Sequence, residues 1–181
     1  MTEMSPLGST NSKPADWERM SEAEKDALRS RPGRPPFGVE MKIVDDAGRE
    51  QPCDGKSSGM LKVRGPWVCS DYFRLGEKSQ AHDEDGWFAT GDVGNMGEDG
   101  TLQITDRSKD VIKSGGEWIS SIDLENVAAG HPKVLQAAVI GVPHPKWDER
   151  PLLIAVPRPG EKPTREELLA WLDGRVAKWW I

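Results

Sequence analysis

The sequence predicts an α+β protein in which an antiparallel β region is followed by a smaller region of mixed helices and strands. Three observations lead to this prediction. Residues 36–105 alternate apolar and polar side chains, which is typical of half-buried strands. After Asp106 the chain contains two apolar runs and two segments with helix signals. Turns rich in glycine, proline and aspartate separate these segments, as expected between short elements.

The first part of the chain predicts one helix and two hairpins. Residues 1–20 are polar and loop-like. "SEAEKDALR" begins with a capping box, Ser21 with Glu24, and "RSRPGRPPFG" ends that helix. From Val39 apolar residues alternate with polar ones, and "GMLKVRG" repeats the alternation after the turn "DDAGRE". "GWFATGDVG" and "TLQIT", joined by the turn "NMGEDG", predict the second hairpin.

The second part predicts shorter strands and two helices. "DVIK" is a short strand, and "SSIDLENVAAG" a helix that stops before the next proline. The apolar runs "VLQAAVIGV" and "PLLIAV" are suited to central strands, and between them Asp148 and Glu149 are interpreted as structural caps or pairs. "TREELLAWLDGRVAKWW" begins with a capping box, Thr164 with Glu167, and predicts a final helix that includes Lys178. Its apolar face carries Leu168, Leu172 and Val176.

Composition and charge exclude several classes of protein. Lys and Arg number 24 and Asp and Glu 30, so the formal charge of −6 argues against a nucleic-acid partner. The start has no signal-peptide pattern, and no apolar run approaches the roughly 20 residues of a membrane span. Cys53 and Cys69 fit reduced thiols better than a disulfide scaffold, and His82, His131 and His144 lack metal-ligand spacing. We therefore expect a cytoplasmic protein.

An ordered series of motifs resembles the acyl-adenylate-forming (AMP-binding) family. The motifs are "GWFATGDVG", "ITDRSKDVIKSGGEWISSIDLE" and "HPKVLQAAVIGVPHPKWDERP". "KSGGEWISS" followed by "PHPKWDERPLL" is most similar to the medium- and long-chain fatty-acid–CoA ligases, and the opening "MTEMSPLGS" is similar to a segment of the same family. Each motif is weak alone, but their order along the whole chain is specific. The resemblance implies an acyl-CoA synthetase that joins a fatty acid to CoA, with ATP and Mg²⁺, through an acyl-adenylate.

The resemblance also implies a division of the chain. Residues 1–105 would be the C-terminal part of the large AMP-binding domain, 106–109 a hinge, and 110–181 the mobile, incomplete C-terminal domain. No stretch resembles the family's phosphate loop, T-S-G-T-T-G-x-P-K, and the late lysine of P-x-T-x-x-G-K is missing. Because charge stabilisation of the transferring phosphoryl group is a dominant catalytic term, we expect the isolated chain to be inactive.

Three candidate residues lie in the first region. In isolation Thr2 and Glu3 are a solvated tail, but the resemblance implies that Thr2 holds an ATP phosphate and that Glu3 ligates Mg²⁺. In isolation Asp92 is a turn aspartate at a strand end. The resemblance implies that its carboxylate accepts both ribose hydroxyls of ATP. Trp87 and Phe88 are interpreted as packing residues.

Five further candidates are Arg107, Lys109, Lys113, Gly115 and Gly116. A solvated charged linker and a plain tight turn are the structural alternatives. The resemblance implies that Arg107 contacts the nucleotide and that Lys109 is the hinge residue. It further implies that the next loop swings into the active site for the second step. There Lys113 supplies catalytic positive charge, and Gly115 and Gly116 line the entry path of the thiol.

Two other functions stay open. The apolar end "WWI" and the absent front half also fit a non-catalytic interaction module, which would dock onto the missing N-terminal portion or form half of a split enzyme. A carrier-protein adenylation domain would keep the family and change the acceptor. The length of the acyl chain is not encoded here, because the resemblance places the acyl pocket upstream.

Overall fold

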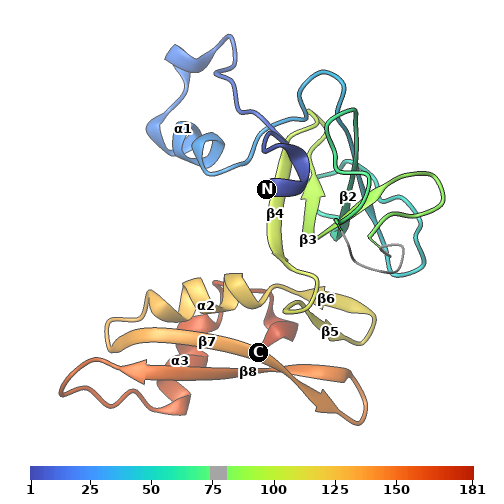
Figure 1. The fold of residues 1–181 in the computed structure, drawn as a ribbon. Helices are drawn as coiled ribbons and strands as arrows, with labels where there is room; N and C mark the ends of the chain where they lie inside the picture. Colours follow the sequence, from blue (N-terminus) through green and yellow to red (C-terminus); the bar gives the residue numbers. More distant parts are fainter. Residues whose placement is uncertain (74–80) are drawn as a thin grey trace. The chain divides into compact units, whose positions relative to one another are not determined.

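The computed structural model describes residues 1–73 and 81–181. It divides into two compact units, Met1–Ile104 and Thr105–Ile181. The described residues form two four-stranded sheets (Figure 1), and the strand pairs with a described register are antiparallel. The predicted α+β class is confirmed.

A helix and two short 3-10 turns precede the first sheet. The turns are η1 (Thr2–Met4) and η2 (Trp17–Arg19), which were not predicted, and the helix is α1 (Glu22–Arg29). The Ser21 hydroxyl accepts from the Glu24 N–H at 3.3 Å, and the Glu24 carboxylate accepts from the Ser21 N–H at 2.8 Å. A helix cap of this kind stabilises a helix by about 1 kcal/mol. The predicted capping box and helix start are confirmed.

The first sheet has the strand order β1-β2-β3-β4. Its strands are β1 (Glu40–Val44), β2 (Gly59–Arg64), β3 (Phe88–Met96) and β4 (Leu102–Arg107). Along β2 buried residues alternate with partly exposed ones, which confirms the predicted period of two. Trp87 and Phe88 are 9% and 2% exposed, so their packing role is confirmed. The core of this unit contains Met4, Val39, Ile43, Leu61, Val63, Phe88, Met96 and Leu102.

One aspartate holds the turn between β3 and β4. Asp99 accepts hydrogen bonds from the Thr101 N–H at 3.0 Å, the Thr101 hydroxyl at 2.6 Å and Arg34 Nη2 at 2.9 Å. These donors, the Thr101 hydroxyl first, favour the charged carboxylate and lower the pKa of Asp99 to about 2. The predicted hairpin is confirmed, although β3 extends through Asn95 and Met96 into the sequence expected to turn.

The second sheet has the strand order β6-β5-β8-β7. Its strands are β5 (Ile112–Ser114), β6 (Glu117–Ile119), β7 (Val134–His144) and β8 (Asp148–Pro157). The helices α2 (Ser121–Ala129) and α3 (Arg165–Leu172) accompany the β7–β8 hairpin (Figure 1), and η3 (Lys178–Trp180) follows. The shared core contains Ile112, Ile119, Leu124, Ala128, Val139 and Leu172. The strand "DVIK" and the helix "SSIDLENVAAG" are confirmed, whereas β6 was not predicted because three residues carry too little periodicity.

The expectation that both apolar runs form central strands is wrong for β7. β8 lies between β5 and β7, and β7 is at the edge of the sheet. Five aliphatic side chains of this hairpin are 45–49% exposed: Leu135, Ile140, Leu152, Ile154 and Val156. Apolar runs without polar alternation favour burial on both faces, but the described helices leave these side chains half exposed.

The predicted final helix is too long. α3 begins at the predicted capping box, where the Thr164 hydroxyl accepts from the Glu167 N–H at 3.2 Å, but it ends at Leu172. Gly174 follows with φ +74°, a conformation that glycine adopts at little cost and that ends a helix. Lys178 therefore lies in η3 and not inside α3. The apolar pattern predicted a longer helix because Val176, which lies beyond the end of α3, packs against the same core as Leu172.

Candidate functional site

Thr2 and Glu3 lie in η1, which is an ordered part of the first unit. The next residue, Met4, is 2% exposed, and the Cys69 N–H donates to the Glu3 carbonyl at 2.8 Å. The Glu3 carboxylate accepts a hydrogen bond from the Tyr72 hydroxyl at 3.1 Å. Burial, and then this bond to Glu3, raise the pKa of Tyr72, so its hydroxyl remains a donor at neutral pH. A solvated tail would make none of these contacts, while the ligand roles of both residues stay predictions.

Asp92 lies in a bulge within β3. Residues 90–92 of β3 stand opposite the single residue Leu61 of β2. Gly91 has φ +77°, and the Thr90 hydroxyl donates to the Leu61 carbonyl at 3.0 Å and accepts from the Asp92 N–H at 3.1 Å. Bulges redirect side chains and are frequent beside active sites. The strand-end alternative is wrong, because β3 continues on both sides of Asp92, and the ribose role stays a prediction.

Arg107 and Lys109 follow a buried carboxylate at the end of β4. Asp106 is 2% exposed and accepts hydrogen bonds from the Ser121 N–H at 2.6 Å and from the Arg107 N–H at 2.7 Å. It thereby pairs the first N–H of α2, a group that has no partner inside its own helix. Arg107 and Lys109 are exposed and line one hollow of about 420 Å³, together with Glu125. The hinge role of Lys109 stays a prediction.

Gly115 and Gly116 form the two-residue turn of the β5–β6 hairpin. Their φ angles are +62° and +87°, and the strands pair directly across them. Two consecutive residues with positive φ are typical of a type I′ turn, which favours glycine at both positions. On β5, Lys113 places its Nζ 5.0 Å from the centre of the Trp118 ring. The tight turn is confirmed, and its role in the thiol path stays a prediction.

Sequence reasoning missed aromatic and cationic residues that adjoin this turn. Trp147 and Trp179 are 42% and 45% exposed. They line a hollow of about 420 Å³ together with Gly115, His144 and Arg150. Exposed indoles suit a flat base, and a guanidinium suits a phosphate. The segment "KWDER" carried a local signal, a tryptophan between cations, but the second tryptophan joins it only through the fold.

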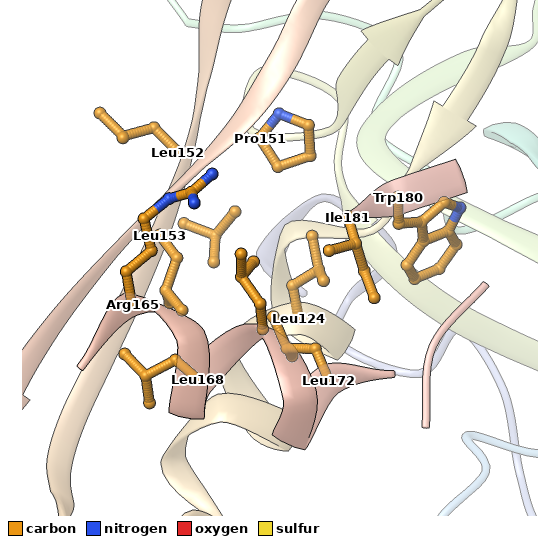
Figure 2. Close-up of a pocket in the computed structure, with 11 residues that line it drawn as sticks. Leu124, Pro151, Leu152, Leu153, Arg165, Leu168, Leu172, Trp180 and Ile181 are labelled. Carbon is orange, nitrogen blue, oxygen red and sulfur yellow. The ribbon is translucent and has the colours of Figure 1, made fainter. Parts of the chain in front are cut away.

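An apolar hollow of about 400 Å³ lies beside α3, β8 and η3 (Figure 2). Its lining consists of Leu124, Val139, Pro151, Leu152, Leu153, Arg165, Leu168, Leu169, Leu172, Trp180 and Ile181. None of the predicted site residues is in this lining. The lining also offers no nucleophile and no acid–base pair, so this hollow is not a candidate active site.

The described residues form neither a group of metal ligands nor a membrane-spanning helix. Among residues 1–73 and 81–181, no three histidine, cysteine, aspartate or glutamate side chains are grouped closely enough to hold a metal ion. A cation at Glu3 would therefore need further ligands, as Mg²⁺ commonly finds in substrate phosphates and water. The described helices include none with the length and apolarity to cross a membrane.

Comparisons with known proteins agree with this architecture. A family model described as the AMP-binding enzyme C-terminal domain matches residues 123–181. The 3-methylmercaptopropionyl-CoA ligase of Ruegeria lacuscaerulensis is 58% identical over 181 residues, which are 100% of this chain and 33% of that ligase. The medium-chain-fatty-acid–CoA ligase of Ectopseudomonas oleovorans is 50% identical over the same shares of both chains. This chain thus spans about a third of the length of these relatives.

A solved structure supports the same relationship. The o-succinylbenzoate CoA synthetase of Bacillus subtilis, in complex with its acyl-adenylate intermediate, matches with a TM-score of 0.73 and 33% identity. The match covers 90% of this chain and 32% of that protein. The fold of this chain is thus similar to that of about a third of this synthetase.

The resemblance read from the motifs is confirmed. Residues 123–181 match the C-terminal domain of AMP-binding enzymes. Two relatives that match this chain over its whole length are a 3-methylmercaptopropionyl-CoA ligase and a medium-chain-fatty-acid–CoA ligase.

Proposed function

We propose that this chain is part of an ATP-dependent acyl-CoA ligase. The observation that carries the proposal is the glycine turn of the β5–β6 hairpin beside a hollow with two exposed indoles and a guanidinium. In the first step of the reaction, a carboxylate oxygen attacks the α-phosphorus of ATP, and the bond to pyrophosphate breaks. In the second step, the CoA thiolate attacks the acyl carbon, and the bond to AMP breaks.

Four residues have proposed roles in the first step. Asp92 accepts the ribose hydroxyls, because a carboxylate on a fixed bulge offers two acceptors. Arg107 contacts the nucleotide with its planar guanidinium, and Thr2 donates its hydroxyl to a phosphate. Glu3 fits Mg²⁺ because it is a hard oxygen ligand already oriented by Tyr72. Mg²⁺, when bound, offsets charge on the ATP phosphates.

The β5–β6 hairpin serves the second step. The two glycines of the turn let the thiol arm of CoA pass close to the backbone. Lys113 supplies positive charge for the thiolate and for the departing AMP phosphate. The nucleotide end of CoA lies in the adjoining hollow, with its base against Trp147 and a phosphate near Arg150. Lys109 is the pivot that brings the hairpin to the adenylate.

The proposed acid is a linear aliphatic carboxylate. Identity is 58% to a 3-methylmercaptopropionyl-CoA ligase and 50% to a medium-chain-fatty-acid–CoA ligase. These values rank 3-methylmercaptopropionate first and fatty acids of medium chain next. The ranking rests on identity alone, because the chain spans about a third of those relatives.

A hybrid enzyme tests the proposal. In the hybrid, this chain replaces the 181 matching residues of the R. lacuscaerulensis ligase, and the rest of that ligase is unchanged. ATP–pyrophosphate exchange and thioester formation are measured with 3-methylmercaptopropionate and with fatty acids of several lengths. We expect both activities in the hybrid and neither in the chain alone. A folded hybrid that is silent with every acid contradicts the proposal.

The CoA hollow is tested on the chain itself. CoA is titrated while tryptophan fluorescence is recorded. Trp147→Ala is expected to weaken CoA binding roughly tenfold or more, because stacking of a base on an aromatic ring contributes about 1–3 kcal/mol. Trp17→Ala, in the first unit, is the matched control. Equal affinities for both variants contradict the placement of the base.

The half-exposed aliphatic face of β7 and β8 favours a second candidate, an interaction module. The partner would be the remaining part of a ligase, supplied as a separate polypeptide. Size-exclusion chromatography with light scattering distinguishes the two candidates. A stable one-to-one complex with the remaining part of the R. lacuscaerulensis ligase supports the interaction module, and a monomer at micromolar concentration contradicts it.

A further inference from the structure

The β5–β6 hairpin contacts the segment that joins β7 to β8 and the first residues of β8. The Gly115 N–H donates to the Trp147 carbonyl at 2.8 Å, and Arg150 Nη1 donates to the Ser114 hydroxyl at 3.2 Å. The Trp147 ring covers the turn so closely that a Cβ added to Gly115 would lie 2.9 Å from its Cε3. The position of the proposed thiol turn therefore depends on residues 147–150.

Glu149 supplies a further contact to β5. Its Oε2 accepts a hydrogen bond from the Lys113 N–H at 3.0 Å. One register pair, Ser114 with Asp148, joins β5 to β8 in the described part of the chain, so backbone pairing on this side is short. In a longer strand pair a backbone carbonyl of the neighbouring strand would accept the Lys113 N–H. Here the Glu149 carboxylate is the acceptor. Without it a partly buried N–H would lose its acceptor, which is costly.

Gly141 of β7 leaves room for this carboxylate. A Cβ added to Gly141 would lie 2.9 Å from Oε2 and 3.1 Å from Cδ of Glu149. Gly141 does not have a positive φ, so alanine is compatible with its backbone. A Cβ at position 141 would therefore displace the Glu149 carboxylate from its place beside β5.

We infer that Glu149 is a positioning residue for the thiol half-reaction. It fixes the backbone of Lys113, and through β5 it fixes the turn of Gly115 and Gly116. The inference rests on the function proposed above. Because a misplacement of about 1 Å can slow a reaction roughly 100-fold, release of β5 slows the step that uses the hairpin. The adenylation step, which uses other residues, is unchanged.

Hydrogen exchange on the chain itself tests whether Glu149 holds β5. Glu149→Ala should speed exchange at the amides of Lys113 and Gly115 roughly tenfold, the effect of one lost acceptor. Glu149→Gln keeps an acceptor oxygen and should restore protection. Gly141→Ala should also speed exchange at Lys113. When it is combined with Glu149→Ala, the exchange rate should be no higher than in Glu149→Ala alone. Glu161→Ala is the matched control, because Glu161 is exposed. Unchanged exchange at Lys113 in Glu149→Ala overturns the inference.

The hybrid enzyme tests the role in the reaction. Glu149→Ala should lower thioester formation by about tenfold to 100-fold and leave ATP–pyrophosphate exchange within about twofold. Glu149→Gln should recover most of the loss. Equal loss of both half-reactions, or a loss that glutamine does not recover, overturns the inference. A hybrid that is silent before substitution contradicts the proposed function and with it the thiol role, whereas exchange at Lys113 reports separately on β5.

Discussion

Replacing Asp106 with alanine removes the acceptor of two backbone N–H groups, one at the start of α2 and one at the end of β4. The carboxylate is 2% exposed, and its oxygens lie 2.6 Å from the Ser121 nitrogen and 2.7 Å from the Arg107 nitrogen. A buried N–H that loses its partner costs about 1–3 kcal/mol. The Ser121 N–H contributes most, because it belongs to a helix end. We therefore expect a loss of about 3 kcal/mol in the free energy of unfolding of the second unit.

This loss is measurable as a shift in Tm. For a unit of this size, 1 kcal/mol corresponds to roughly 4–8 °C, so Asp106→Ala should lower the Tm of the second unit by about 12–24 °C. Differential scanning calorimetry of the full chain records the transition, and hydrogen exchange at α2 assigns it to the second unit. Asp110→Ala is the matched control, since it removes the same charge from an exposed neighbour. If both variants melt within about 2 °C of the unsubstituted chain, the proposal that Asp106 stabilises the start of α2 is refuted.

Three further predictions concern stability. Folding lowers the pKa of Asp99 from 3.8 to about 2, so its contribution is complete above about pH 4 and lost as the pH falls through 2. Asp99→Asn should therefore lower the Tm at pH 7 and make the Tm fall less between about pH 4 and pH 2 than it does in the unsubstituted chain. The same dependence of Tm on pH in both proteins would contradict this. Gly115→Ala should lower the Tm more than Gly116→Ala. Both positions have positive φ, which costs other residues about 1–2 kcal/mol, but only at Gly115 does a Cβ meet an indole ring. Equal losses would count against that contact. Among the described atoms the Trp180 indole N–H is buried without a partner, whereas that of Trp171 donates to a carbonyl of α2 at 2.8 Å. Chemical denaturation should therefore show a smaller loss for Trp180→Phe than for Trp171→Phe, and the reverse order would contradict the assignment.

Signals within a few residues of one another were sufficient for much of the fold. The capping boxes at Ser21 and Thr164 predicted two helix starts, because the cap and its partner are three residues apart. Adjacent glycines predicted the turn at Gly115, because positive φ is a property of the local backbone. Alternation of apolar and polar residues predicted strands of the first sheet, because successive side chains of a strand point to opposite faces of the sheet.

The surroundings of the candidate residues were less predictable. Asp92 was found from its motif, but the bulge that presents it depends on the register between β2 and β3. Arg107 was also found from its motif. The hydrogen bond of its buried neighbour Asp106 with the Ser121 N–H was not predicted, because it forms only when the start of α2 lies beside the end of β4. Trp147 was overlooked, because the hollow it lines forms only when β8 and η3 are placed beside the hairpin.

The amino-acid sequence alone determined the family, the α+β class, the helix starts and the glycine turn, since each depends on short patterns or on their order. Tertiary structure decided the edge position of β7, the end of α3 at Leu172 and the contact of Glu149 with the Lys113 N–H. The physical reason is that these features join segments far apart in the chain. Glu149 and Lys113 are 36 residues apart, and no local preference of either residue specifies the other.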